Sequence, residues 1–154
     1  IIDNKKHGIC IQYYDNGEIE NSGTYKKGKK NGEFITFYPN GNTHITGQYK
    51  DDKINGKETC YFESGKLDCI NEYKNGIKHG KFKNYFENGV LEEEGYLING
   101  NLHGKNKIYF ENGQLRIEQN IIDGYLDPNG IKNEYNKYGK LISSENYKDG
   151  KIVK

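Results

Sequence analysis

Two of the three cysteines in this chain stand where they could react with each other. Cys60 and Cys69 flank a Ser64-Gly65 turn signal, and a hairpin around that turn would place them directly opposite, in a non-hydrogen-bonded pair with closely spaced backbones. This geometry suits a cross-strand disulfide, which would leave Cys10 unpaired and favour an exported or cell-envelope protein over a cytoplasmic one. The alternative is two reduced core thiols. Equivalent segments of the chain carry Thr36 and Ile45, or Ile108 and Ile117, at these positions.

Other reactive residue types do not form a convergent group. His79 and His103 each precede a glycine at equal spacing, which on paired strands puts them ~10 Å apart, too far to share one metal ion. Gly76 to Lys81 is one residue short of a phosphate-binding loop, and Phe82 follows where Ser or Thr would be needed. The carboxylates recur periodically instead of gathering at one place. We therefore expect no catalytic residues, no metal, no cofactor and no enzymatic activity.

The composition favours a thin, tyrosine-rich sheet. Only 32% of the residues are hydrophobic and the mean hydropathy is -1.04, yet aromatics reach 13% and the 20 glycines recur at fixed intervals. A net charge of +1 gives no field that would attract a nucleic-acid backbone, so no nucleic acid is expected. No apolar run approaches the ~18 residues of a membrane helix.

A 24-residue repeat organises the chain. Glycines mark it at Gly8, Gly32, Gly56, Gly80 and Gly104, and a sixth copy opens at Gly130 after a two-residue insertion around Pro128. We number positions in each repeat from this glycine as position 0. The predicted copies, in one array over 1–154, are 8–31, 32–55, 56–79, 80–103, 104–129 and 130–154, with 1–7 as the end of a preceding repeat, so the array is expected to extend upstream. Periods of this length indicate stacked supersecondary units.

Each repeat contains two turn signals. The first is Asn-Gly or a similar pair at positions 8 and 9, as in Asn16-Gly17, for which we expect a type I′ turn with positive φ at both residues. The second falls at positions 19 and 20, as in Asn75-Gly76. β-Branched, aromatic and leucine residues flank these turns. The pattern predicts an all-β fold, an elongated single-layer antiparallel sheet of stacked β-hairpins.

The segment from Gly80 to His103 reads GKFKNYFENGVLEEEGYLINGNLH and resembles the bacterial type (variant 2) of the MORN repeat, the membrane occupation and recognition nexus. The resemblance extends over essentially the whole chain. It implies a solenoid-like sheet of hairpins and roles in scaffolding, membrane association or antitoxin-like activity. Asn136 and Tyr138 depart from the motif, so the last copy is expected to be a modified cap. Cell-wall-binding hairpin repeats fit less well because they use Trp, which is absent, and Tyr-Asp repeats of toxin shells have shorter periods.

Strand alternation predicts two faces. A two-residue turn would pair position 6 with 11, giving a thin core of Tyr14 with Ile19 or Phe62 with Leu67, joined by the tyrosines of position 17. The opposite face would carry an aromatic series edged with carboxylates. The series consists of Tyr13, Phe37, Tyr61, Tyr85, Tyr109 and Tyr135, and the carboxylates are Asp15, Glu63, Glu87 and Glu111. At a spacing of ~9.6 Å these rings could hold an extended basic peptide, or they could only shield the backbone.

A lysine-rich edge follows the second turns. It consists of Lys26, Lys27, Lys29, Lys30, Lys50, Lys53, Lys74 and Lys78. Such an edge could contact anionic lipid headgroups, or it could protect the sheet edge and keep the protein in solution. We expect a mostly monomeric, non-enzymatic scaffold that binds a protein or peptide partner through the aromatic and acidic face, with edge-to-edge association possible. The alternatives are peripheral membrane association through the lysines and an antitoxin-like role.

Overall fold

The computed structural model describes residues 5–153, so most of the predicted partial repeat at 1–7 lies outside the described residues. The chain divides into two compact units, Ile1–Ile77 and Lys78–Lys154, which we describe separately. Every regular element of the described residues is a β-strand, and none of these residues belongs to a helix long and apolar enough to cross a membrane. The predicted all-β fold is confirmed.

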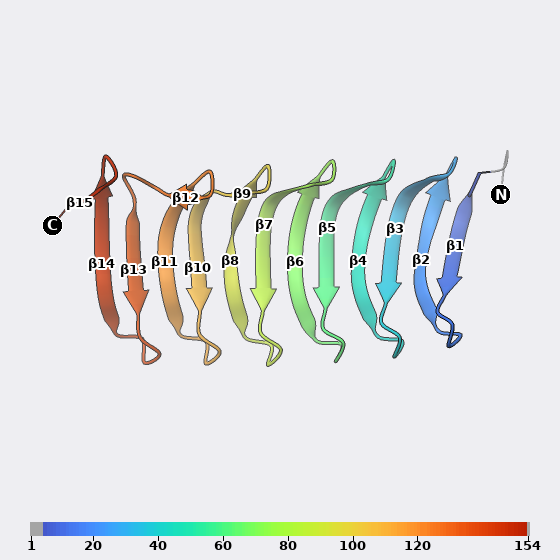
Figure 1. The fold of residues 1–154 in the computed structure, drawn as a ribbon, viewed down its shortest axis with the longest axis horizontal. Helices are drawn as coiled ribbons and strands as arrows, with labels where there is room; N and C mark the ends of the chain where they lie inside the picture. Colours follow the sequence, from blue (N-terminus) through green and yellow to red (C-terminus); the bar gives the residue numbers. More distant parts are fainter. Residues whose placement is uncertain (1–4, 154) are drawn as a thin grey trace. The chain divides into compact units, whose positions relative to one another are not determined.

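The first unit is an antiparallel sheet in which each strand pairs with the next along the chain (Figure 1). Its strands are β1 (Gly8–Tyr13), β2 (Ile19–Lys26), β3 (Lys29–Phe37), β4 (Thr43–Lys50), β5 (Lys53–Tyr61) and β6 (Leu67–Lys74). All the pairings are antiparallel, from β1 with β2 to β5 with β6. Sequential hairpins are what the two turn signals of each repeat predicted.

The second unit continues the same pattern with two short additional strands. Its strands are β7 (Ile77–Tyr85), β8 (Leu91–Ile98), β9 (Asn101–Leu102), β10 (Gly104–Tyr109), β11 (Leu115–Ile122), β12 (Tyr125–Leu126), β13 (Ile131–Tyr135), β14 (Leu141–Lys148) and β15 (Lys151–Val153). β8 pairs with β7, β9 and β10, and β11 pairs with β10, β12 and β13. β14 pairs with β13 and β15.

The first turn of each repeat differs from the predicted type I′ turn. Gly17 N–H donates to the carbonyl of Tyr14 over 3.0 Å, and Tyr14 N–H donates to the carbonyl of Glu18 over 2.8 Å. Gly17 has a φ of 88°, whereas Asn16 is outside the positive-φ region. This is a type I turn followed by a left-handed glycine. The prediction of positive φ at both residues is therefore wrong for this turn.

The type I′ turns are the second turns. Asn75 and Gly76 have φ values of 54° and 88°, and they are the only residues between β6 and β7. Even Asp51 and Asp52, a pair without glycine, have φ values of 50° and 69°. A two-residue loop between twisted strands imposes this conformation, because type I′ geometry matches the strand twist.

The longer first turn changes which residues face each other. The pairing shifts by one residue just before it, so that Cys60 pairs with Cys69 but Tyr61 pairs with Leu67. The other repeats have the same irregularity at this point. Directly opposed residues share a face, so the position 11 residues lie with the aromatic series of position 5. The predicted pairing of position 6 with 11 is wrong, because it assumed a two-residue turn without a bulge.

The most buried hydrophobic side chains lie further from the first turn. Phe34 and Phe82, both at position 2, are 6% exposed, and Ile121, at position 17, is 5% exposed. The ring of Phe34 covers Gly23, where an added Cβ would lie 1.9 Å from Cδ2 of Phe34. Tyr25 and Tyr49 pack edge-on against Phe34, with ring centroids at 5.9 and 5.6 Å. The predicted core role of these two position 17 tyrosines therefore fits the packing around Phe34.

Candidate functional site

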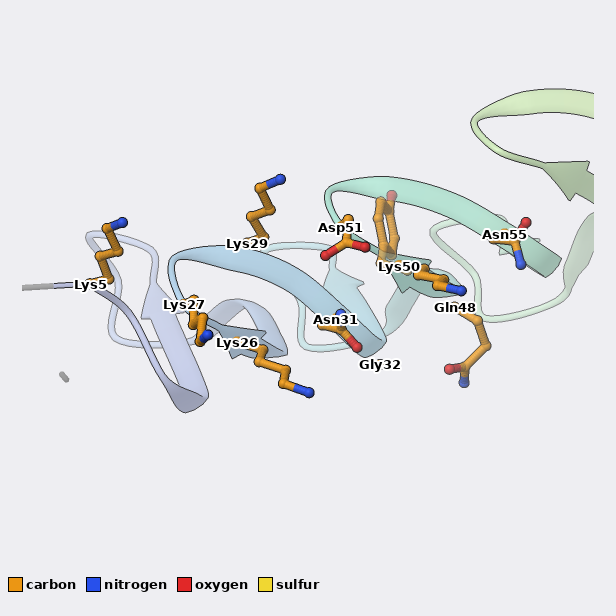
Figure 2. A pocket seen from close by; sticks show the side chains of 11 residues that line it. Lys5, Lys26, Lys27, Lys29, Asn31, Gly32, Gln48, Lys50, Asp51 and Asn55 are labelled. Carbon is orange, nitrogen blue, oxygen red and sulfur yellow. The ribbon is translucent and has the colours of Figure 1, made fainter. Parts of the chain in front are cut away.

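A hollow of about 800 Å³ lies at the second turns of the first unit (Figure 2). We call it the lysine hollow, because five of its lining residues are lysines. It is lined by Lys5, Lys26, Lys27, Lys29, Asn31, Gly32, Gln48, Tyr49, Lys50, Asp51 and Asn55. Figure 2 shows the side chains of Lys5 and Lys29 extending to the same side of the ribbon. The amide side chains add neutral hydrogen-bond donors, so the lining can bind anionic oxygen atoms.

The type I′ turns place these lysines. Lys26 and Lys29 are directly opposed on β2 and β3, and Lys50 is opposed to Lys53 on β4 and β5. Like charges in directly opposed positions destabilise a sheet. A bound anion would relieve this repulsion.

The positive charge of the hollow is largely uncompensated. Asp51 is its only carboxylate among the lining residues. The neighbouring carboxylate of Asp52 accepts the backbone N–H of Lys30 over 2.8 Å and so serves the turn. Within residues 5–153, the ion pairs all involve other cations, and none includes the five lysines of the hollow.

The predicted lysine edge is only partly reproduced by this site. Lys26, Lys27, Lys29 and Lys50 line the hollow. Lys30 instead covers the core, with Nζ 3.9 Å from the ring centroid of Phe34 and 5.2 Å from that of Tyr49. Lys53 and Lys74 are exposed outside the hollow, and Lys78 belongs to the second unit.

Sequence reasoning missed Lys5. It lies three residues before Gly8, at the place that Lys29 occupies before Gly32. The repeat period therefore contained the signal that would have found it.

Apart from Tyr13, the aromatic series is half-buried rather than open. Tyr61, Tyr85 and Tyr109 are opposed to Leu67, Leu91 and Leu115, and Tyr13, on the first strand, is 58% exposed. Phe37 and Tyr135 are likewise partly buried, opposed to Thr43 and Leu141. Aromatic and leucine pairs of this kind stabilise a sheet without any ligand. Binding of a peptide along this series stays a prediction.

The carboxylates predicted to edge the aromatic series lie in the first turns. Each of them stands at position 7, directly after the residue at position 6, and is exposed. They are Asp15, Glu63, Glu87 and Glu111. The backbone carbonyls of Glu63 and Glu111 accept side-chain amide hydrogen bonds from Asn40 and Asn88 in the preceding repeat, both over 3.1 Å. These segments therefore connect neighbouring hairpin tips.

A different carboxylate reaches the aromatic series. The hydroxyl of Tyr109 donates to Oε1 of Glu94 over 3.0 Å, and Lys83 Nζ lies 3.3 Å from the other oxygen of Glu94. Burial, together with the hydrogen bond to Glu94, raises the pKa of Tyr109 to about 12. Sequence reasoning missed Glu94, because it lies on β8 of the preceding hairpin and only the pairing within each hairpin was considered.

The predicted opposition of Cys60 and Cys69 is confirmed by the register of β5 and β6. Their Cα atoms lie 4.8 Å apart, close to the spacing of a non-hydrogen-bonded pair, and their sulfur atoms are in direct contact. The disulfide and the compartment it would favour stay predictions. Cys10 is free and partly exposed.

Comparison with known families explains the repetition of these features. A family model described as a MORN repeat variant matches residues 6–27, 30–51, 54–75, 78–99 and 102–123. The chain belongs to the MORN repeat family. Each MORN match holds one first turn between its two strands and ends within a second turn. The matches stop before the last predicted copy, in which Asn136 and Tyr138 depart from the motif.

Membership of the MORN family supports a repeat scaffold of a typically non-catalytic kind. No curated protein matches the chain.

Proposed function

We propose that this MORN repeat protein is a non-catalytic scaffold that associates with an anionic membrane surface through the lysine hollow. The observation that carries the proposal is the set of five lysines around one cavity, with a single carboxylate and without ion pairs among the described residues. Phosphate and carboxylate groups of anionic headgroups have the charge that this lining lacks.

The expected strength of membrane association follows from the number of lysines in the hollow. A lysine close to an anionic bilayer contributes about 1 kcal/mol, so five contribute about 5 kcal/mol if all approach the surface. That is roughly a 10³- to 10⁴-fold gain in membrane partitioning. Because the charges are exposed, salt must weaken the association.

Edge protection by lysine is the competing explanation. It accounts for exposed lysines at strand ends and predicts no association with vesicles. It gives no reason for like charges to be opposed at Lys26 and Lys29 while carboxylates are scarce around them.

Flotation with vesicles separates these explanations. The whole chain should float with phosphatidylcholine vesicles that contain phosphatidylserine, at an ionic strength of about 0.1 M, and stay at the bottom with phosphatidylcholine alone. It should be released at about 1 M salt, where the Debye length falls to about 3 Å. Equal flotation with both lipids, or no flotation at all, contradicts the proposal.

A protein partner on the aromatic series is a second candidate, supported by the regular row of partly exposed rings. We infer that an extended segment would lie across these strands and that its cations would stack on the rings. Replacement of Tyr61, Tyr85 and Tyr109 by Ser together should abolish partner capture from a lysate while circular dichroism still reports a sheet. Unchanged capture by the folded variant rejects this surface.

A further inference from the structure

We propose that Glu58, Cys60 and Cys69, when the cysteines are reduced, form a binding site for a thiophilic divalent cation such as Zn²⁺. The donor atoms of the three side chains lie within 4.8 Å of one another. The contact from Glu58 Oε2 to Cys60 Sγ is 3.9 Å. Thiolate and carboxylate are established zinc ligands, with Zn–S bonds of about 2.3 Å and Zn–O bonds of about 2.0–2.2 Å.

The register of β5 and β6 builds the site from four neighbouring positions. Cys60 is opposed to Cys69, and Glu58 is opposed to Asn71. Glu58 and Cys60 are two residues apart on β5, and Cys69 and Asn71 are two apart on β6, so all four side chains project from one face. A cation above this face would meet two sulfur ligands and one oxygen ligand, with a fourth position left for water.

Asn71 orients the ligands. It is only 2% exposed, and its amide nitrogen lies 3.1 Å from Glu58 Oε2 and 3.1 Å from Cys69 Sγ. Outer partners of this kind fix the orientation of metal ligands.

The arrangement is specific to the third repeat. The equivalent four positions carry Phe34, Thr36, Ile45 and Gly47 in the second repeat, and Asn106, Ile108, Ile117 and Gln119 in the fifth. Sequence reasoning considered the two cysteines alone and missed Glu58 and Asn71. Strand alternation alone places both on the face of the cysteines, with Glu58 at position 2 and Asn71 at position 15.

Binding of the cation depends on pH and on the redox state of the two cysteines. Two thiols and one Zn²⁺ give a dithiolate complex and two released protons, so the affinity should rise with pH until the thiols are ionised. A Cys60–Cys69 disulfide has no thiolate to offer. Oxidation by a thiol oxidant such as oxidised glutathione should therefore abolish binding, with the glutathione reduced to two thiols in exchange.

Cobalt provides a direct probe. The fully reduced whole chain, titrated with Co²⁺ without oxygen, should develop thiolate-to-cobalt charge-transfer absorption at one equivalent and lose it when Zn²⁺ is added. The Cys10→Ser variant, which retains the pair, should behave the same. Cys60→Ser and Cys69→Ser should lose the absorption, and Glu58→Gln should bind the cation more weakly because it removes the carboxylate ligand.

Alkylation of the unmodified sequence gives a second readout that does not depend on the folding of a variant. Zn²⁺ should slow the alkylation of Cys60 and Cys69 in the reduced chain and leave Cys10 unaffected, as followed by peptide mass spectrometry. The proposal is overturned if the reduced chain gives no charge-transfer absorption, if Cys10→Ser removes it, or if Zn²⁺ protects none of the thiols.

Discussion

The hydroxyl of Tyr14 donates a hydrogen bond to the backbone carbonyl of Phe37, 2.7 Å away in the next repeat. Tyr38 makes the equivalent bond to the carbonyl of Tyr61 over 2.9 Å. Neighbouring hairpins of the first unit are therefore connected by side chains as well as by the backbone ladder. Later repeats carry Phe62, Phe86 and Phe110 at this position and lack the hydroxyl.

Removal of these hydroxyls should weaken the first unit. Each of Tyr14→Phe and Tyr38→Phe should lower the free energy of unfolding by about 1 kcal/mol, because a partly buried carbonyl loses its partner. Urea denaturation measures the change. Tyr13→Phe is the matched control, since Tyr13 is largely exposed and donates no side-chain hydrogen bond within the described residues. Equal effects of Tyr13→Phe and Tyr14→Phe would contradict the role of this bond.

Because the ring of Phe34 contacts Gly23, we expect a strong preference for glycine at residue 23. Gly23→Ala would place Cβ 1.9 Å from the ring and should destabilise the protein by about 3 kcal/mol, at the upper end for overpacking. Gly47→Ala should cost less, because its nearest neighbour is the flexible Cδ1 of Ile54 at 3.1 Å. The unfolding temperature of Gly23→Ala should be clearly lower than that of Gly47→Ala. The reverse order would show that Phe34 does not lie over Gly23.

The left-handed conformation at the second turns can be tested at Asn75. Its φ of 54° disfavours residues other than Gly, Asn and Asp. Asn75→Ala should therefore cost about 1–2 kcal/mol, while Asn75→Gly should be nearly neutral. Denaturant unfolding of the two variants provides the comparison. If alanine is tolerated as well as glycine, the turn is not type I′.

We expect ionisation of Tyr109 to lower the stability of the folded protein at alkaline pH. Burial and the hydrogen bond to Glu94 raise its pKa to about 12 in the folded state, above about 10 for a free phenol. Its contribution is therefore complete below about pH 10 and is lost as pH rises toward 12. Ultraviolet titration of tyrosinate should lose one late-titrating phenol in Tyr109→Phe, and this phenol should titrate at lower pH in Glu94→Gln. A Glu94→Gln titration identical to that of the parent would contradict the assigned cause.

The sequence predicted the strands and the turn positions, but not the type of each turn. Gly17 and Gly76 are both left-handed and both follow an asparagine. What distinguishes the two turns is the conformation of Asn16 and Asn75, and this depends on the number of residues in the closed loop. Loop length is a property of the strand pairing, which the dipeptide alone does not encode.

The one-residue shift in strand pairing before the first turn also explains which site residues could be predicted from the sequence. Cys60 and Cys69 lie beyond the bulge, where the simple pairing still holds, and their opposition was predictable. Tyr61 lies at the bulge and pairs with Leu67, so the face of Leu67 was assigned wrongly. The lysine hollow depends on where several turns lie in space, and only the periodicity of its lysines was visible in the sequence.

We expect the opposed lysines of the hollow to bind an anionic surface. Lys148 and Lys151 provide a matched control, because they oppose each other on β14 and β15 as Lys26 and Lys29 do on β2 and β3. The deciding measurement is the affinity of two double variants for vesicles containing phosphatidylserine. Lys26→Glu with Lys29→Glu should weaken binding by at least about 30-fold, from about 1 kcal/mol per lost lysine, and Lys148→Glu with Lys151→Glu should leave most of it. Equal losses in both would contradict a specific site and leave only a general effect of net charge.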